Sequence, residues 1–250
     1  MSVYPPEEFQ VNRFDVTPEQ LNKFLSLVFR SCDETEIDVF LRANPEILAF
    51  VSVFFLTGYH NAWVIPQQLI RPRVGSQTKG LKPDYLFAGE NSDGITWWVL
   101  ELKGANETIW IEDKNGDFRF GDAANRGINQ LTRYIDYCTT NQETIRGAYR
   151  ITTFTEPKGV LIIGREHEFK NNEEKRRLKS RHNKNNPHLQ IRTYDALIRK
   201  IAEAGQISYK LPWLQKLQIN LLTTKPGDDV QYHAIETDID EEKFAILNEH

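Results

Sequence analysis

The sequence of 250 residues predicts an α/β fold in which a mixed central β-sheet is flanked by helices. Three observations indicate this class. Apolar residues recur at helical spacing near the amino terminus and again at 128–138. Short apolar runs punctuated by proline and glycine fill 63–103, a pattern typical of strands and turns. The run 159–164, Gly-Val-Leu-Ile-Ile-Gly, has the continuous hydrophobicity of a buried strand.

The amino-terminal third is predicted to be helical. Thr17-Pro18-Glu19-Gln20 combines a capping hydroxyl, a first-turn proline and a glutamine at the third helical position, and apolar residues follow at helical spacing. Residues 33–36 repeat this start signal. Asn44-Pro45 interrupts the pattern that follows, so we expect two short helices that meet at this dipeptide.

Strands and a second set of helices are predicted after residue 63. Strands are expected near 64–70, 83–88 and 95–103. The turn sequence 113–117 lies between two aromatic runs and predicts a hairpin, which could cover a neighbouring site. A helix follows from Gly121-Asp122, and its apolar residues Ile128, Leu131, Ile135 and Cys138 share one face. The buried strand at 159–164, a strand at 189–193 and a helix from Asp195 complete the core.

Composition bounds the class of protein. Hydrophobic residues make up 40% and charged residues 26% of the chain, as in ordinary soluble domains. The formal charge of −4 gives no global sign of a nucleic-acid partner, so any basic surface must be local. Cys32 and Cys138 form no Cys-x-x-Cys pair, which argues against structural zinc and fits a reducing compartment. We find no secretory signal and no apolar run of about 20 residues, and expect a soluble, cytoplasmic protein without a membrane partner.

The strongest chemical signal is a strand that ends in two charges. In Trp97–Lys103 the period of two places Glu101 and Lys103 on one face, and burying such charges is costly unless they are paired or hold a metal. Asp84, on the preceding strand, comes alongside Glu101 if the two strands form a hairpin. Two adjacent carboxylates repel, and a hard divalent cation relieves that repulsion. We therefore expect Mg²⁺ at this point, with Mn²⁺ able to substitute.

These residues resemble the motif of the PD-(D/E)XK nuclease superfamily, here Pro83-Asp84 and Glu101-Leu102-Lys103. The resemblance implies a restriction-endonuclease-like core, metal ligation by Asp84, Glu101 and the Leu102 carbonyl, and a catalytic role for Lys103. In nuclease branches resembling RecB, a Gln-xxx-Tyr helix borders the site, and Gln130 and Tyr134 match that spacing. An exposed amide beside a half-buried tyrosine is the alternative explanation of this pair.

The chain also resembles the Shedu anti-phage defence proteins over roughly 35–205. The resemblance rests on five landmarks in order: Asn44-Pro45-Glu46, Pro83-Asp84, Glu101-Leu102-Lys103, Gly164-Arg165 and Thr193-Tyr194-Asp195. It implies a metal-dependent DNA endonuclease that acts on phage or plasmid DNA, and a homo-oligomer. We accordingly divide the chain into an amino-terminal helical extension (1–34), a nuclease domain (35–210) and a carboxy-terminal segment with an acidic tail (211–250).

Several further residues are candidates with a second interpretation open. Glu46 could supply another acidic metal ligand or be a solvated helix carboxylate. Arg165 could bind a phosphate or pair with a nearby acid. The basic stretch 170–192 could follow a DNA backbone or form a solvated helix face. Its candidate contacts are Arg176, Arg177, Lys179 and Arg181.

Motifs of other enzyme classes are incomplete or missing. The glycine spacing of 75–80 is that of a phosphate loop, but Leu81 stands where the lysine is required. The sequence has no Gly-x-Ser-x-Gly, His-Glu-x-x-His or Gly-x-Gly-x-x-Gly motif. The remaining alternative is a PD-(D/E)XK scaffold that binds nucleic acid or a partner protein without cutting, with Glu101 and Lys103 merely paired.

Overall fold

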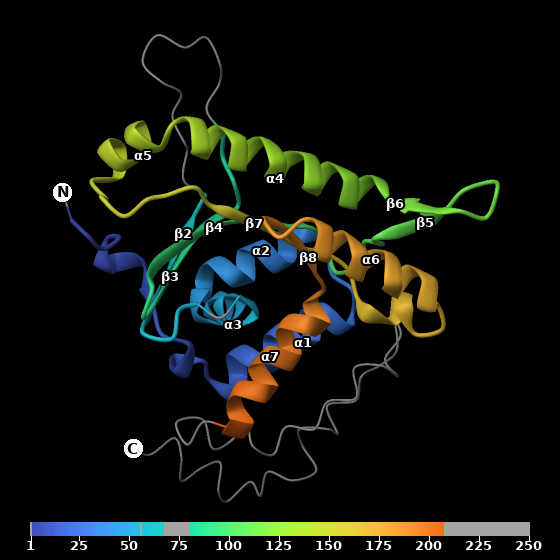
Figure 1. Cartoon of the computed structure of the whole chain (residues 1–250). Helices are drawn as coiled ribbons and strands as arrows, with labels where there is room; N and C mark the ends of the chain where they lie inside the picture. The colour runs from blue at the N-terminus through green and yellow to red at the C-terminus, as the bar shows by residue number, and fades with distance from the viewer. Residues whose placement is uncertain (1, 56, 68–80, 208–250) are drawn as a thin grey trace, which may run out of the picture.

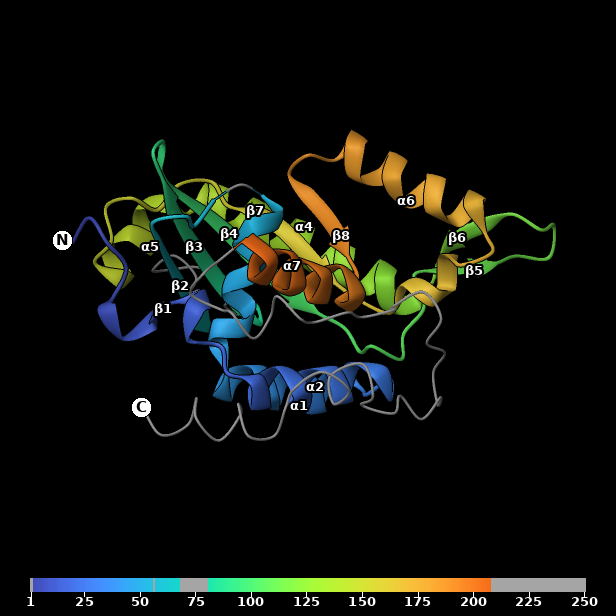
Figure 2. The ribbon, with the colours of Figure 1, turned by 90° about the horizontal axis from the view of Figure 1, so that it is seen from below.

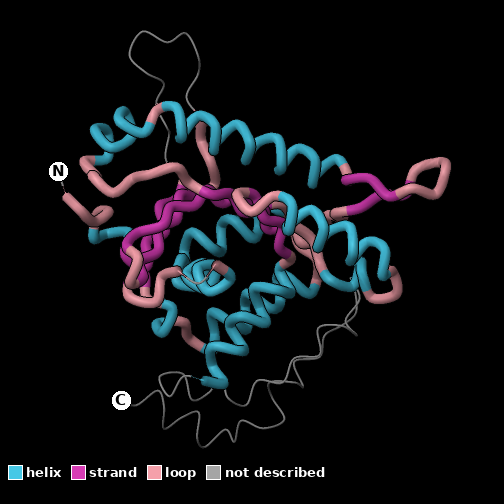
Figure 3. Tube along the Cα trace, in the orientation of Figure 1, coloured by secondary structure: helices cyan, strands magenta, loops and turns pink. Residues whose placement is uncertain are grey.

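The computed structural model describes residues 2–55, 57–67 and 81–207. The expected acidic tail at 211–250 and the glycine-spaced segment 75–80 lie outside these ranges, as does the end of the strand expected at 64–70. Within them, the chain forms a mixed central sheet with helices on both faces, which confirms the predicted α/β class (Figures 1 and 3).

The central sheet has six strands in the order β1-β2-β3-β4-β7-β8. Its antiparallel half contains β1 (Gln10–Val11), β2 (Asn61–Pro66), β3 (Tyr85–Asn91) and β4 (Gly94–Leu102). The parallel half adds β7 (Lys158–Ile162) and β8 (Leu189–Arg192), both aligned with β4. Tight pairing of β3 with β4 is expected because only the short turn between Asn91 and Gly94 separates them.

Helices α1 (Pro18–Phe29), α2 (Glu34–Ala43), α3 (Val51–Phe54) and α7 (Tyr194–Ile207) cover one face of the sheet, and α4 (Asp122–Thr140) and α5 (Gln142–Tyr149) cover the other (Figures 1 and 2). Alternate side chains of β4 point to opposite faces of the sheet, so β4 contributes to the hydrophobic core on each face. Trp98, Leu100 and Leu102 point toward α1 and α7, whereas Trp97 and Val99 point toward α4.

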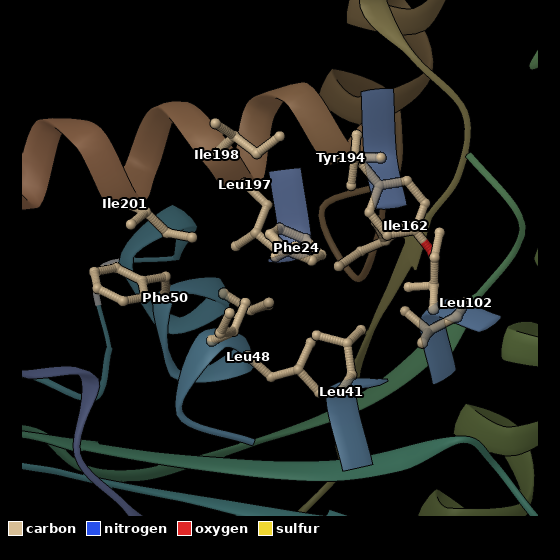
Figure 4. Close-up of a cluster of buried hydrophobic side chains, with 14 of the residues drawn as sticks. Phe24, Leu41, Leu48, Phe50, Leu102, Ile162, Tyr194, Leu197, Ile198 and Ile201 are labelled. Carbon is tan, nitrogen blue, oxygen red and sulfur yellow. The ribbon is translucent and has the colours of Figure 1, made fainter. Parts of the chain in front are cut away.

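The core beneath α7 lies closest to the end of β4. Figure 4 shows Leu197, Ile198 and Ile201 of α7 above Leu41 and Leu48, with Leu102 beside them. All of these side chains are fully buried. This packing fixes the position of α7 relative to the residues that follow β4.

Helix α1 begins as predicted. The Thr17 hydroxyl accepts a hydrogen bond from Gln20 N at 3.2 Å, and the Gln20 side chain accepts one from Thr17 N at 2.8 Å. The helix then contributes Leu21, Phe24 and Val28 to the core shared with α7 and the sheet. Helix α1, which falls in the expected amino-terminal extension, therefore packs into the body of the molecule.

The break at Asn44-Pro45 is present, but the segment after it is not a single helix. Helix α2 ends at Ala43, a 3-10 helix η3 (Pro45–Phe50) follows, and α3 adds one further turn. Two shorter 3-10 helices, η1 (Glu7–Phe9) and η2 (Arg13–Asp15), precede α1. In the described ranges no helix combines the length and apolar character needed to cross a membrane.

The predicted hairpin forms a second, two-stranded sheet of β5 (Trp110–Glu112) and β6 (Phe118–Phe120). It projects from the body next to helix α6 (Glu173–Asn185), as Figures 1 and 2 show. Its base is anchored by Glu168 in the 3-10 helix η4 (Glu166–Phe169), whose carboxylate accepts hydrogen bonds from the backbone of Ile109 and Trp110 at 2.9 and 2.7 Å. The hairpin is therefore held at a fixed place beside α4.

Candidate active site

The antiparallel pairing of β3 with β4 brings two carboxylates together. Tyr85 pairs with Leu100, so Asp84 and Glu101 occupy the next opposed positions, where both strands meet the end of the sheet. The backbone N–H of Leu102 donates a hydrogen bond to Asp84 Oδ2 at 2.8 Å. This bond ties the Asp84 side chain to the strand that carries Glu101 and Lys103.

Lys103 lies at the centre of the group and is only 7% exposed. Its ammonium donates to Glu101 Oε1 at 2.8 Å, to the Leu102 carbonyl at 2.9 Å and to Glu34 Oε2 at 3.2 Å. The three predicted core residues Asp84, Glu101 and Lys103 are thus brought together by the hairpin pairing of their strands. The same geometry places the lysine charge against three oxygen atoms.

Burial raises the pKa of both carboxyl groups. For Asp84 the pKa rises to about 6, mainly through desolvation, and the Leu102 hydrogen bond and the Lys103 charge only partly oppose this. For Glu101 the pKa rises to about 7, first through desolvation and then through repulsion from Asp84. Glu101 Oε2 is buried and has no hydrogen-bond partner among the described residues. The site therefore holds more negative charge than Lys103 alone compensates.

Glu34 is a site residue that the sequence did not single out. It is the first residue of α2, directly after the capping residue Asp33, and its carboxylate faces the Lys103 ammonium. Glu46, the acid expected at this place, lies in η3 and accepts a hydrogen bond from the Gln20 side chain instead. Glu46 is therefore not among the acids that contact Lys103, and its role as a metal ligand stays a prediction.

Gln130 and Tyr134 border the site from α4. Tyr134 is buried, and its hydroxyl donates to the Lys82 carbonyl at 3.2 Å, two residues before Asp84. Desolvation, followed by the charges of Glu101 and Asp84, raises the pKa of Tyr134 to about 12. Gln130 is half-buried and hydrogen bonds to Tyr134. The pair supports the segment that leads into Asp84.

Arg165 does not face a binding surface. It is 1% exposed, and its guanidinium binds Asp195 at 3.0 Å and the Val28 carbonyl at 3.1 Å, with its central carbon 4.8 Å from the centre of the Phe29 ring. The suggestion that it holds a phosphate is corrected in favour of the ion pair. Its signal in the sequence, Gly-Arg after a buried strand, does not tell a buried pair from an exposed contact.

The basic stretch forms helix α6, which has no fully buried residue. Arg177 and Arg181 are exposed, and Arg176 is exposed while pairing with Glu173. Lys179 differs, since it is half-buried over the Phe169 ring, and burial lowers its pKa to about 8. The outward face of α6 therefore carries cations, whereas Lys179 faces the body of the protein.

The donor set fits a hard divalent cation. Asp84, Glu101 and the Leu102 carbonyl offer oxygen atoms, and Glu101 Oε2 is buried without a partner among the described residues. Across the described residues, no three His, Cys, Asp or Glu side chains are arranged to hold a metal ion together. A cation at this site would thus depend on two carboxylates and a backbone carbonyl. The Lys103 ammonium contacts two of these oxygens, Glu101 Oε1 and the Leu102 carbonyl, so a cation bound to them would replace these two lysine hydrogen bonds.

The chain is similar to known proteins in sequence and in structure. A family model described as "Shedu protein SduA, C-terminal" matches residues 31–198. No curated protein matched the sequence. Among solved structures, the chain is similar to the restriction endonuclease FokI bound to DNA, with a TM-score of 0.39 and 12% identity, over 81% of this chain. The chain spans 30% of the length of that endonuclease chain.

Proposed function

Because the chain belongs to the Shedu family, whose SduA carboxy-terminal model matches residues 31–198, we propose that it is a metal-dependent DNA endonuclease of anti-phage defence. The observation that carries this proposal is the meeting of Asp84, Glu101 and Lys103 at the ends of β3 and β4. A buried group of this kind is costly to keep without a use, because neither carboxylate is fully compensated.

Each side chain has a role that follows from its place. Asp84 and Glu101, with the Leu102 carbonyl, would hold Mg²⁺ or Mn²⁺, which when bound supplies charge neutralisation at a phosphodiester and a more acidic water. Lys103 directly follows the same strand, and one of its three N–H groups, which bind Glu101, Leu102 and Glu34, would turn to a phosphate oxygen or to the attacking water. Glu34 holds the Lys103 ammonium from the opposite side and so limits its movement. Tyr134 and Gln130 support the approach to Asp84.

DNA is the proposed substrate, and helix α6 supports this. Its outward residues Arg177, Arg181 and Lys184 are exposed cations on a chain whose formal charge is −4. Cations grouped in this way can neutralise backbone phosphates without reading the sequence. We propose phage or plasmid DNA as the target and a homo-oligomer as the active form, acting in the cytoplasm.

A digestion panel tests the activity directly. Linear, circular, nicked and single-stranded DNA would each be incubated with the protein in Mg²⁺, in Mn²⁺ or in EDTA. We expect cleavage with either metal and none in EDTA. Metal-independent cleavage would contradict the proposed site. Binding without cleavage under all conditions would favour a non-catalytic nucleic-acid or partner-binding module.

Two variants locate the chemistry. Glu101→Gln and Lys103→Met are each expected to lower the cleavage rate by about 10²-fold or more, because the first removes an anionic metal ligand and the second removes a cation next to the reacting phosphate. Lys103→Met should still bind Mn²⁺ in calorimetry, since Asp84 and Glu101 remain. Lys114→Met, at the exposed tip of the hairpin, is the matched control and should cut at the wild-type rate. Wild-type cleavage by Lys103→Met would remove the lysine from the mechanism.

A further inference from the structure

Tyr194 connects α7 to the end of β4 through one hydrogen bond. It is the first residue of α7 and is fully buried, with its ring against Phe24 and beside Leu102 and Ile162 (Figure 4). Its hydroxyl donates to the backbone carbonyl of Lys103 at 2.8 Å. The ring alone would fill this space equally well, so the hydroxyl is the part that requires an explanation.

The Lys103 carbonyl lies where the sheet no longer constrains the chain. The Lys103 N–H still donates to Ile162 O at 2.9 Å, but β4 ends at Leu102 and the next residue is Gly104. The peptide plane before a glycine can turn over a wider range than others, because glycine lacks a Cβ and its φ is less restricted. Outside contacts must therefore fix the orientation of this peptide.

Two hydrogen bonds hold the carbonyls of Lys103 and Gly104, and both lead to α7. The Tyr194 hydroxyl holds the Lys103 carbonyl, and the Gly164 N–H donates to the Gly104 carbonyl at 3.1 Å. The Gly164 carbonyl in turn accepts from the Tyr194 N–H at 3.2 Å. Tyr194 thus binds Lys103 directly through its side chain, and its backbone is linked to Gly104 through Gly164.

The residues on either side of Tyr194 are held by hydrogen bonds of their own. Asp195, the next residue, is fully buried and binds Arg165, and its carboxylate also accepts from the Glu166 N–H at 2.7 Å. Thr193 caps the first turn of α7 through its hydroxyl, which accepts from Ala196 N at 3.2 Å. The tyrosine hydroxyl is therefore held at a fixed point relative to the sheet.

We propose that Tyr194 is a positioning residue for Lys103: its hydroxyl fixes the Lys103 carbonyl and thereby the direction in which the lysine side chain leaves the backbone. This inference rests on the proposed role of Lys103 in DNA cleavage. Without the hydroxyl, the Lys103–Gly104 peptide can rotate, and the ammonium loses its defined place between Glu101 and Glu34. Small displacements of a reacting group lower the rate strongly.

The experiment compares Tyr194→Phe with two controls. Tyr4→Phe removes a hydroxyl that binds Glu90 at 3.2 Å on an exposed part of the molecule. Phe24→Leu loosens the packing under the Tyr194 ring but leaves the hydroxyl in place. Each protein is examined by nitrogen-15 NMR of the Lys103 ammonium, identified by its loss in Lys103→Arg, over a range of pH. Cleavage is followed as separate kcat and KM values.

For Tyr194→Phe we expect a displaced Lys103 ammonium resonance with an altered titration, a kcat lowered roughly ten- to hundredfold, and a KM within about twofold of wild type. Both controls should keep the wild-type resonance and kcat. A purely structural role predicts instead that Phe24→Leu and Tyr194→Phe behave alike, and that result would overturn the proposal.

The two proposals fail separately. Absence of cleavage by the wild-type protein under every condition of the digestion panel counts against the endonuclease, and the NMR comparison still decides the role of Tyr194. An unmoved Lys103 resonance in Tyr194→Phe overturns the positioning role even if the wild type cuts DNA. Should Tyr194→Phe fail to fold, replacement by 3-fluorotyrosine, whose hydroxyl donates more strongly, takes its place. An unchanged Lys103 ammonium signal in that protein would equally overturn the proposal.

Discussion

At the scale of single residues, the site is governed by desolvation of two acids. Asp84 and Glu101 have pKa values of about 6 and 7, above the usual value near 4 for free carboxyl groups. Between about pH 4 and pH 7 the folded chain therefore binds more protons at these groups than the unfolded chain does. By linkage, their contribution to the free energy of unfolding is present below this window and is lost as pH rises through it.

Because the pKa of Asp84 is raised, the effect of Asp84→Asn on the free energy of unfolding is expected to depend on pH. The amide oxygen can still accept the Leu102 N–H, but the buried charge and its repulsion with Glu101 are removed. At pH 8 the metal-free variant should be more stable than wild type by roughly 1–3 kcal/mol, and at pH 5 the difference should shrink. Urea denaturation at both pH values measures this. A constant difference between pH 5 and pH 8 would contradict the burial of an ionised Asp84 carboxylate as the cause.

The same substitution should weaken metal binding. Protons and a divalent cation compete for the two carboxylates, so wild-type Mn²⁺ affinity is expected to increase from pH 5 to pH 8. Calorimetric titration of Asp84→Asn should show at least a tenfold loss of affinity, because losing even an outer partner of a metal ligand costs about ten- to hundredfold. Asp84→Asn would then raise the free energy of unfolding and weaken metal binding at the same time, a trade-off that is common at functional sites.

Arg165 and Asp195 form a second buried group, in which the acid has a counterion at 2.9 Å although burial still raises the pKa of Asp195. Both side chains are fully enclosed, and removing one partner leaves the other charge without a counterion. Arg165→Met is expected to lower the free energy of unfolding by about 3–5 kcal/mol. Arg177→Met, an exposed arginine, is the control and should change it by less than about 0.5 kcal/mol. Equal stability of the two variants would restore the possibility that Arg165 serves a ligand.

Local sequence rules predict some of these residues and not others, for a physical reason. Asp84, Glu101 and Lys103 could be predicted because a strand period and a short hairpin are local rules. The sequence alone does not show that Glu34, and not Glu46, contacts Lys103, because this depends on how the start of α2 packs against the end of β4. Arg165 follows its strand as predicted, yet its burial depends on α1 and α7, which contribute Val28 and Asp195 from distant positions.

At the scale of elements, the β5–β6 hairpin depends on one acid. The Glu168 carboxylate accepts two backbone N–H groups and lies 3.6 Å from Lys175. Glu168→Ala would leave both N–H groups without an acceptor, at a cost of about 1–3 kcal/mol for each buried one. We expect a lower free energy of unfolding and faster proteolysis between residues 112 and 120. Glu174→Ala, on the exposed face of α6, is the control, and equal proteolysis of the two variants would show that the hairpin is held by other contacts.

The hairpin itself was predictable from Asp113-Lys114-Asn115-Gly116-Asp117, and Gly116 adopts the left-handed backbone that such a turn requires. Its anchor was not predictable, because Glu168 lies some distance along the chain in η4.

The outer edge of β8 is covered by a side chain of α6. Asn183 of α6 exchanges two hydrogen bonds with the backbone of Ile191, at 2.8 and 3.0 Å, and so occupies the edge that another strand could otherwise extend.

At the scale of the whole molecule, the two helical layers separate two tasks. The layer of α1, α2 and α7 supplies Glu34 and Tyr194, which hold Lys103 from one side. The layer of α4 supplies Tyr134, which supports the approach to Asp84 from the other. The order of helices and strands was predictable from periodicity, whereas this convergence depends on the packing of both layers against the end of β4 (Figure 2).

The exposed cations of α6 are the local basic surface through which the protein is expected to bind DNA. A chain with a formal charge of −4 is not drawn to DNA by its net charge, so any electrostatic affinity must come from a local surface. Replacing Arg177 and Arg181 by glutamine should weaken DNA binding in EDTA for every sequence tested. If both residues contact phosphates, the slope of log affinity against log salt should become shallower by up to about 2, since each phosphate contact contributes about 0.9. Fluorescence anisotropy over a salt series measures this slope.

The matched control for this charge argument replaces Lys23 and Arg30, two exposed cations of the α1 region, by glutamine. It makes the same change in net charge as the α6 variant. A general electrostatic effect predicts equal losses of affinity for the two proteins, whereas a phosphate-binding face on α6 predicts a loss for the α6 variant alone. Equal losses would therefore remove α6 as the DNA contact while leaving the Asp84–Glu101–Lys103 site untouched.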